Sequence, residues 1–154
     1  MKYEELLTEA NDTGISVDES FPFNGRLKGL YVDGNIALSS NLTNSVERKC
    51  ILAEELGHHH TTYGNIVDMS STENRKQELK ARIWAYNKLV GLNGIINTYK
   101  HGCKTLHEAA NYLDVTEEFL SECIECYRQK YGEYTTCDNY IIYFEPTLGV
   151  LELI

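Results

Sequence analysis

The segment CILAEELGHH, residues 50–59, carries the strongest structural pattern in this chain of 154 residues. Glu54 and His58 are four residues apart, so an α-helix places both on one face, one turn from each other. Cys50 and Ile51 lie one turn earlier on the same stripe, which predicts that this face points toward the protein interior. A carboxylate and an imidazole on an inward face need a partner, because an unpaired buried charge is costly. A metal ion is one such partner.

A second glutamate, Glu55, follows the first directly. In the motif His-Glu-x-x-His, the glutamate beside the first ligand takes a proton from water whose pKa the metal has lowered. Glu55 occupies that position relative to Glu54 and His58. The sequence therefore predicts a metal-dependent hydrolase, with Glu55 as the general base and with Glu54 and His58 as metal ligands.

The third ligand is predicted on a later helix. Glu78 lies in line with Ala81, Ala85 and Leu89, which follow it at helical spacing. A carboxylate at the head of a stripe of small and apolar residues is expected to face the neighbouring helix rather than water. Three protein ligands leave one position open for water, which is the arrangement of catalytic zinc sites.

Simpler explanations exist for the same residues. Glu and His four residues apart usually form a solvated helix face. The run His58–His60 also suits a loosely structured helix end, where cations interact favourably with the helix dipole. An inward Glu78 could pair with Arg75 or Arg82 in place of a metal. The spacing alone leaves these alternatives open.

Patterns elsewhere predict an α+β fold, in which a small antiparallel sheet packs on a helical bundle and the site lies between two helices. Asp33-Gly34 separates two apolar runs, which indicates a β-hairpin. Asn44 with Glu47, and Ser70 with Glu73, have the spacing of helix-capping boxes. We expect strands at 27–32, 35–38 and 140–144, helices at 2–10, 45–60, 71–90, 105–113 and 115–131, a helical or extended piece at 94–100, and a chain break at 64–65.

The chain is expected to form one domain over residues 1–154. A catalytic core at 27–90 precedes a helical part at 94–131 and a C-terminal strand and tail at 138–154. The formal net charge of −9 opposes binding to phosphate backbones, so we expect no direct nucleic-acid partner. The sequence shows neither an apolar signal core nor a run of about 18 apolar residues, so we expect a cytoplasmic protein without a membrane partner.

The five cysteines are expected to be free thiols, because an odd number without a secretory signal does not suggest a disulfide framework. Cys123 and Cys126 form a C-x-x-C pattern inside a predicted helix, where packing is a better explanation than zinc or redox chemistry. Residues 105–127 resemble a helix-turn-helix, which makes a DNA-binding protein a competing function. Its second helix is acidic and has no basic residue before Arg128, which is the wrong sign for phosphate.

Residues 50–59, together with QELKARIWAYNKLV at 77–90, resemble the active-site helix and the glutamate helix of the ImmA/IrrE family of metallopeptidases. The resemblance covers residues 27–90 well and includes the order of hairpin, active-site helix and glutamate helix. It implies a zincin-like active-site helix and a zinc-dependent endopeptidase, with Glu55 as the base and His58 and Glu78 as ligands. Members of this family often reside in mobile elements or prophages and cleave a helix-turn-helix repressor, which would be the partner here.

The chain departs from the family at the first ligand, where the usual histidine is replaced by Glu54. Glutamate is a competent zinc ligand, but a Glu, His, Glu set is harder and more negative, and could favour Mn²⁺ or another hard ion over Zn²⁺. A second register would use Glu55 and His59 as ligands and would lose the general base. A regulator that binds metal and repressor without proteolysis is therefore the first alternative to a peptidase.

Overall fold

The computed structural model describes residues 1–61 and 71–154, and the chain divides into two compact units, Met1–Lys88 and Leu89–Ile154. The α+β class is confirmed, because helices and two small sheets make up both units. The predicted break at 64–65 and the predicted cap at Ser70 lie outside the described residues. Within the described ranges, no helix has the length and the apolar composition that crossing a bilayer requires.

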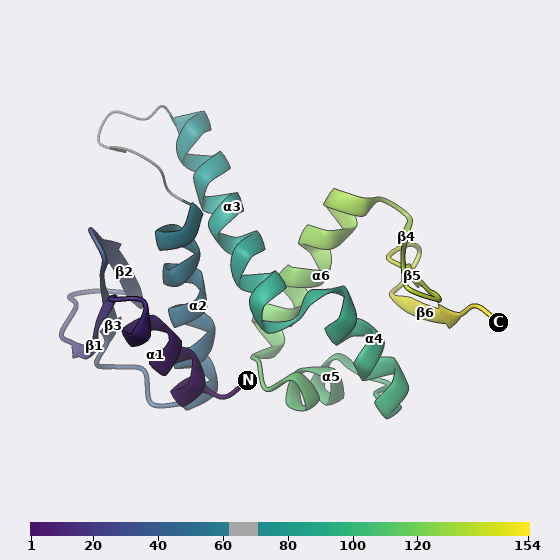
Figure 1. Cartoon of the computed structure of the whole chain (residues 1–154), viewed down its shortest axis with the longest axis horizontal. Helices are drawn as coiled ribbons and strands as arrows, with labels where there is room; N and C mark the ends of the chain where they lie inside the picture. The colour runs from purple at the N-terminus through teal and green to yellow at the C-terminus, as the bar shows by residue number, and fades with distance from the viewer. Residues whose placement is uncertain (62–70) are drawn as a thin grey trace. The chain divides into compact units, whose positions relative to one another are not determined.

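The first unit is built around helix α2 (Ser45–Thr61), which packs on the sheet on one side and contacts α3 (Ser71–Leu89) on the other (Figure 1). Helix α1 (Tyr3–Asp12) packs against α2 and the sheet. The sheet contains β1 (Ser16–Phe21), β2 (Gly29–Val32) and β3 (Asn35–Ser39), in the order β1-β3-β2. The core of this unit lies between the sheet and the helices. Its side chains are almost wholly buried and include Leu6, Ile36, Leu38 and Leu52.

The hairpin of β2 and β3 forms as predicted. Asp33 and Gly34 both have positive φ, 45° and 80°, as the tight turn between twisted strands requires. The prediction of an antiparallel sheet needs one correction, because β1 pairs with β3 in parallel. Strand β1 was missed because its sequence SVDESF is polar and nearly all of its residues are exposed, so no alternation of apolar residues marks it.

Helix α2 begins where the sequence predicts. The side chain of Asn44 accepts a hydrogen bond from the backbone N–H of Val46 at 2.7 Å, which caps the free N–H groups of the first turn. Glu47, the expected partner in a capping box, lies with its carboxylate 3.9 Å from Lys28 Nζ. The helix buries Cys50, Leu52, Ala53, Leu56 and Gly57. Because these residues are buried, the remaining side chains of α2 point either along its sheet side or along its α3 side.

The second unit contains helices α4 (Gly91–His101), α5 (Leu106–Leu113) and α6 (Glu117–Tyr131), with a sheet of β4 (Tyr134–Cys137), β5 (Tyr140–Tyr143) and β6 (Gly149–Glu152). This sheet is antiparallel throughout. The predicted strand at 140–144 corresponds to β5, and the tail expected at 138–154 also contains β6. Strands β4 and β6 are short and lack a clear alternation of apolar residues, so only β5 was predictable.

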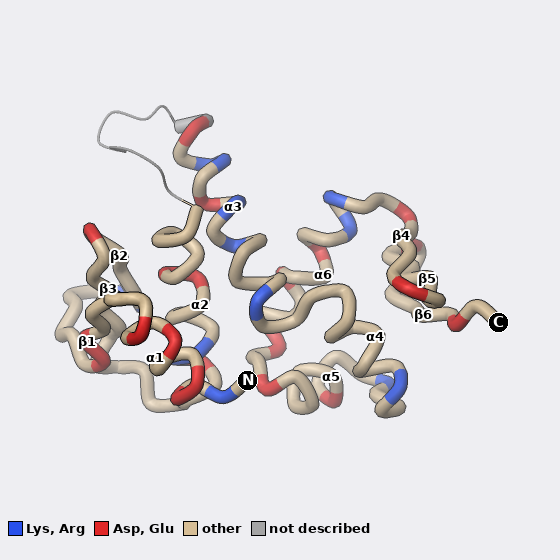
Figure 2. The backbone as a smooth tube through the Cα atoms, in the orientation of Figure 1, with Lys and Arg blue, Asp and Glu red and all other residues tan. Residues whose placement is uncertain are grey.

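Helices α5 and α6 match the predicted helical pair. Asp114 adopts the left-handed conformation between them, and Thr116 caps α6 by accepting from the N–H of Phe119 at 3.0 Å. The acidic residues of the first turn of α6, Glu117 and Glu118, are exposed. Figure 2 marks acidic residues along the backbone in red. The C-x-x-C pattern lies on α6, as predicted, and all five cysteines are thiols that form no disulfide, also as predicted.

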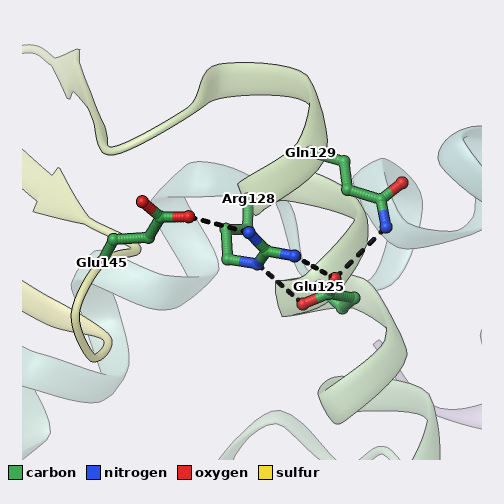
Figure 3. Close-up of polar contacts among 4 residues, drawn as sticks. All are labelled: Glu125, Arg128, Gln129 and Glu145. Carbon is green, nitrogen blue, oxygen red and sulfur yellow. Dashed lines mark hydrogen bonds and ion pairs between the residues drawn. The ribbon is translucent and has the colours of Figure 1, made fainter.

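Arg128 fastens α6 to the segment after β5 (Figure 3). Its guanidinium donates to the carboxylate of Glu125, one turn earlier, and to Glu145 Oε1 at 2.7 Å. The Glu125 carboxylate also accepts from Gln129 at 3.2 Å. These hydrogen bonds lower the pKa of Glu125 to about 2. The cluster is exposed, so it orients the segment rather than forming part of the core.

Candidate active site

Helices α2 and α3 approach each other through their backbones. Gly57 lies at the contact, and a Cβ there would meet the carbonyl oxygen of Ala81 at 2.2 Å, closer than any real contact. Ala81 and Ala85 are fully buried, which confirms that the predicted stripe of small residues forms the contact face of α3. Glycine opposite alanine removes the side-chain layer that normally separates two helices. Side chains beside this contact can therefore reach from one helix to the other.

His58 and Glu78 meet beside this contact, with 2.9 Å between Nε2 and Oε2. His58 follows Gly57 directly, and Glu78 lies one turn before Ala81. The contact confirms that Glu78 faces the neighbouring helix. The expectation that it avoids water is wrong, because its side chain remains 53% exposed while that of His58 is 25% exposed. The pair therefore lies at an accessible edge of the helix contact, where a solvent molecule or a substrate can reach it.

Glu55 lies beside the ion pair and is partly buried. Burial raises the pKa of its carboxyl to about 7, and the nearby charges of Glu54 and Glu78 add to the shift. Strand β2 covers it, because a Cβ built at Gly29 would lie 3.1 Å from Glu55 Cγ and 3.3 Å from Oε1. A half-buried carboxyl with a pKa near neutrality can both accept and release a proton under physiological conditions.

The three consecutive histidines have three different partners. Successive residues of a helix point about 100° apart, so the rings leave α2 in different directions. His58 meets Glu78, His59 Nδ1 lies 2.8 Å from the hydroxyl of Tyr31 on β2, and the ring of His60 stacks on Trp84 of α3 at 4.7 Å. Burial lowers the pKa of His60, with smaller contributions from His59 and Lys88. All three lie in the last turn of α2, as the helix-end alternative expects, and each has a contact of its own there.

Of the predicted ligands, the structure brings His58 and Glu78 into contact. An imidazole nitrogen and a carboxylate oxygen at hydrogen-bond distance are donors that suit a divalent ion. Glu54 lies close enough to raise the pKa of Glu55, but its role as the first ligand stays a prediction. In residues 1–61 and 71–154, no group of three or more His, Cys, Asp or Glu side chains is arranged to hold a metal ion. The donor set therefore fits such an ion at two of its three positions.

Four residues of this region were not predicted: Gly29, Tyr31, Gly57 and Trp84. Gly57 carried a usable signal, because glycine in the middle of a helix is unfavourable and calls for a packing reason. Gly29 and Tyr31 alternate along a predicted strand, but nothing in the sequence indicates which helix that strand face would meet. Trp84 lies outside the predicted stripe of Ala81, Ala85 and Leu89, so that stripe did not indicate its partner.

Comparison with protein families gives a match that covers most of the chain. A family model of peptidases, described as the IrrE N-terminal-like domain, matches residues 2–125. These residues include the hairpin, α2 and the described part of α3, and also reach into α6. No curated protein and no solved structure matches the chain.

Proposed function

The chain belongs to the IrrE N-terminal-like family of metallopeptidases, and from this premise we propose that it is an endopeptidase that hydrolyses a peptide bond with the help of a divalent ion. The observation that carries the proposal is the contact of His58 with Glu78 across α2 and α3, beside the half-buried carboxyl of Glu55. A hydrolase of this class needs metal-binding side chains and a proton carrier within one small region, and these residues supply both.

In this proposal Glu54, His58 and Glu78 hold the ion, which is Zn²⁺ or, given the two carboxylates, Mn²⁺. The ion supplies the Lewis acidity that makes water a nucleophile near neutral pH. Glu55 accepts the proton of the attacking water on its carboxylate. The same carboxyl then releases this proton to the amide nitrogen as the C–N bond breaks. Burial favours the protonated form of this carboxyl, which suits a group that takes up a proton in the first step and holds it until the second.

The substrate proposed is a helix-turn-helix repressor of the phage or mobile-element type, encountered in the cytoplasm. Support comes from the family resemblance and from the charge of the chain. A net charge of −9 discourages direct contact with DNA phosphates, and the exposed glutamates at the start of α6 add to this effect. An acidic protein can instead approach the basic surface of a repressor, whose DNA-binding helices carry positive charge.

A non-proteolytic regulator that binds metal and repressor is the second candidate. It is favoured by Glu54, which stands where the family has a histidine and which adds negative charge beside Glu55. More negative charge around an ion makes nearby water less acidic, so less hydroxide is available as nucleophile at neutral pH. Such a regulator would bind the repressor without cutting it.

One experiment distinguishes the peptidase from the non-proteolytic regulator. Protein purified without a histidine tag is analysed for bound metal. It is then incubated with the repressor that is encoded on the same phage or mobile element as the chain. We expect about one equivalent of ion and a cut repressor. Glu55→Gln should keep the ion and lose the cleavage. Glu47→Gln is the matched control on the same helix and should cleave like the wild type, because the ion pair of Glu47 with Lys28, at 3.9 Å, involves no residue of the proposed site.

Less than about half an equivalent of any divalent ion, without rebinding, would contradict the metal site. Binding of the intact repressor by wild-type protein that contains its ion would favour the regulator. If Glu55→Gln still cleaves, Glu55 is not the base. Salt-sensitive binding to duplex DNA at low ionic strength would favour the third possibility, a DNA-binding protein.

A further inference from the structure

Strand β2 and helix α2 share a line of contacts that continues beyond the carboxyl of Glu55. Alternate residues of a strand point to one side, so Gly29 and Tyr31 both face α2. Gly29 lies against Glu55, and the hydroxyl of Tyr31 lies 2.8 Å from His59 Nδ1. Because Glu55 and His59 are four residues apart on α2, they share a helix face. The pair of Tyr31 and His59 therefore lies one helical turn beyond the proposed base, on the same side of the helix.

The direction of the hydrogen bond between Tyr31 and His59 follows from acidity. A phenol loses its proton more readily than a neutral imidazole, and an imidazole nitrogen accepts better than a phenol oxygen. The hydroxyl of Tyr31 therefore donates to Nδ1, and the ring proton of neutral His59 is placed on Nε2. In the part of the chain that the structure describes, Nε2 of His59 has no hydrogen-bond partner.

The orientation of the His59 ring is also restricted, by contacts with two neighbouring rings. It makes edge contacts with Tyr31, at 5.4 Å between ring centroids and 73° between planes, and with His60, at 5.0 Å and 82°. The His60 ring is itself stacked on Trp84 of α3. A donor whose orientation is fixed in advance stabilises a developing charge more than a mobile one, because no reorganisation is needed.

We propose that His59 donates its Nε2–H to the carbonyl oxygen of the peptide bond that the site cleaves, and that Tyr31 is the positioning residue that fixes this tautomer. The inference rests on the proposed function. As the oxygen of water bonds to the carbonyl carbon, the carbonyl oxygen gains negative charge, and the hydrogen bond from His59 stabilises it. The proton of water passes to Glu55 and then to the leaving nitrogen as the C–N bond breaks, so His59 stays neutral throughout.

The first test reads the tautomer of His59 and needs neither substrate nor metal. Nitrogen-15 NMR of the imidazoles is recorded at about pH 8, where an ordinary histidine is neutral, and His59→Gln assigns the signals. We expect the proton of His59 on Nε2 in the wild type and a mixture of tautomers in Tyr31→Phe. Tyr3→Phe is the matched control, because it deletes a phenol that donates to Glu19 at 2.6 Å in the same unit. A proton on Nδ1 in the wild type overturns the proposal.

The second test measures cleavage of the repressor by the metal-loaded chain. We expect kcat to fall about 100-fold in His59→Phe and about 10-fold in Tyr31→Phe, with KM unchanged, because the donor acts on charge that appears in the transition state. His59→Gln, which retains an N–H donor, should keep more activity than His59→Phe. Tyr3→Phe should behave like the wild type.

The outcomes separate this proposal from the one on which it rests. If the wild type cleaves and the variants of His59 and Tyr31 cleave equally well, the donor role is overturned while the peptidase stands. If the wild type contains its ion but cleaves nothing, the peptidase proposal has failed, and the donor role falls with it even when the tautomer is as expected. A selective loss of kcat together with an Nε2 proton supports the proposal.

Discussion

Two helix contacts, one in each unit, are built around an interior glycine but use it differently. At Gly57 a Cβ would meet backbone, with the carbonyl oxygen of Ala81 at 2.2 Å. At Gly94, in α4, the atoms nearest to a Cβ would be side-chain atoms, Leu113 Cδ2 and Val90 Cγ1, both at 3.4 Å. The first contact is rigid because neither backbone can yield, whereas side chains can adjust at the second. A rigid contact can hold two reactive groups at a fixed distance, and a flexible one cannot.

The charged residues near the two contacts also differ, in how much of each is exposed to solvent. Beside Gly57, His58 and Glu78 reach across two helices, and Glu55 is buried enough to have a pKa of about 7. In the second unit the acidic residues at the start of α6 are exposed. Burial is costly for a charged group unless it has a partner. Beside the α2–α3 contact the fold therefore accepts this cost at Glu55.

The largest expected effect comes from removing a charge at the first contact. Glu78→Gln keeps the shape of the side chain but removes a ligand charge, so we expect the affinity for Zn²⁺ or Mn²⁺ to fall at least about 100-fold. Titration with a competing chelator measures it. The matched change in the second unit, Glu118→Gln, removes an exposed charge and should leave the affinity unchanged. Equal loss in both variants would mean that general charge, not the site, attracts the ion.

The next effect tests the rigidity of the α2–α3 contact. Gly57→Ala gains about 1 kcal/mol in helix propensity but forces a methyl group against the Ala81 carbonyl, and overpacking of this kind costs about 3 kcal/mol. We expect a net destabilisation of about 2 kcal/mol, measured by urea unfolding. Metal affinity should fall as well, because separating the helices pulls His58 from Glu78. An unchanged midpoint in urea would show that the helices can move apart without cost.

The opposite sign is expected at the second contact. Gly94→Ala adds the same methyl group where the nearest side-chain atoms, of Leu113 and Val90, lie at 3.4 Å, an ordinary van der Waals distance. The gain in helix propensity should then dominate and stabilise the protein by about 0.5–1 kcal/mol. Urea unfolding measured beside Gly57→Ala gives the comparison directly. Destabilisation at Gly94 would mean that the side chains there are packed as rigidly as the backbones at Gly57.

The sequence predicted those structural features that depend on residues close to one another in the sequence. The hairpin turn at Asp33-Gly34, the cap at Asn44, the course of α2 and the small-residue face of α3 were all expected from local patterns and were confirmed. Strand β1 was not expected, because its pairing with β3 joins segments that share no local signal. The partners of Glu55 and His59 on β2 were missed for the same reason.

For the candidate site, spacing along α2 proposed Glu54 and His58, while the contact with Glu78 required knowledge of how two helices approach. The decisive residue was Gly57, which is neither charged nor apolar and which a search for reactive side chains passes over. Tyr31 was overlooked because its hydroxyl matters only through His59. Sequence reasoning thus found the groups that do chemistry more readily than the residues that position them.

The smallest expected effect concerns charges that lie outside any helix contact. Arg128→Met removes the hydrogen bonds to Glu125 and Glu145 on the surface of the second unit. Water screens these exposed charges, so we expect a loss of stability smaller than either glycine effect, and one that disappears at about 1 M salt. Urea unfolding at low and high salt measures it, with Gly94→Ala as a salt-independent control. A loss that persisted at high salt would mean that the arginine stem packs the segment after β5 and that its charge contributes little.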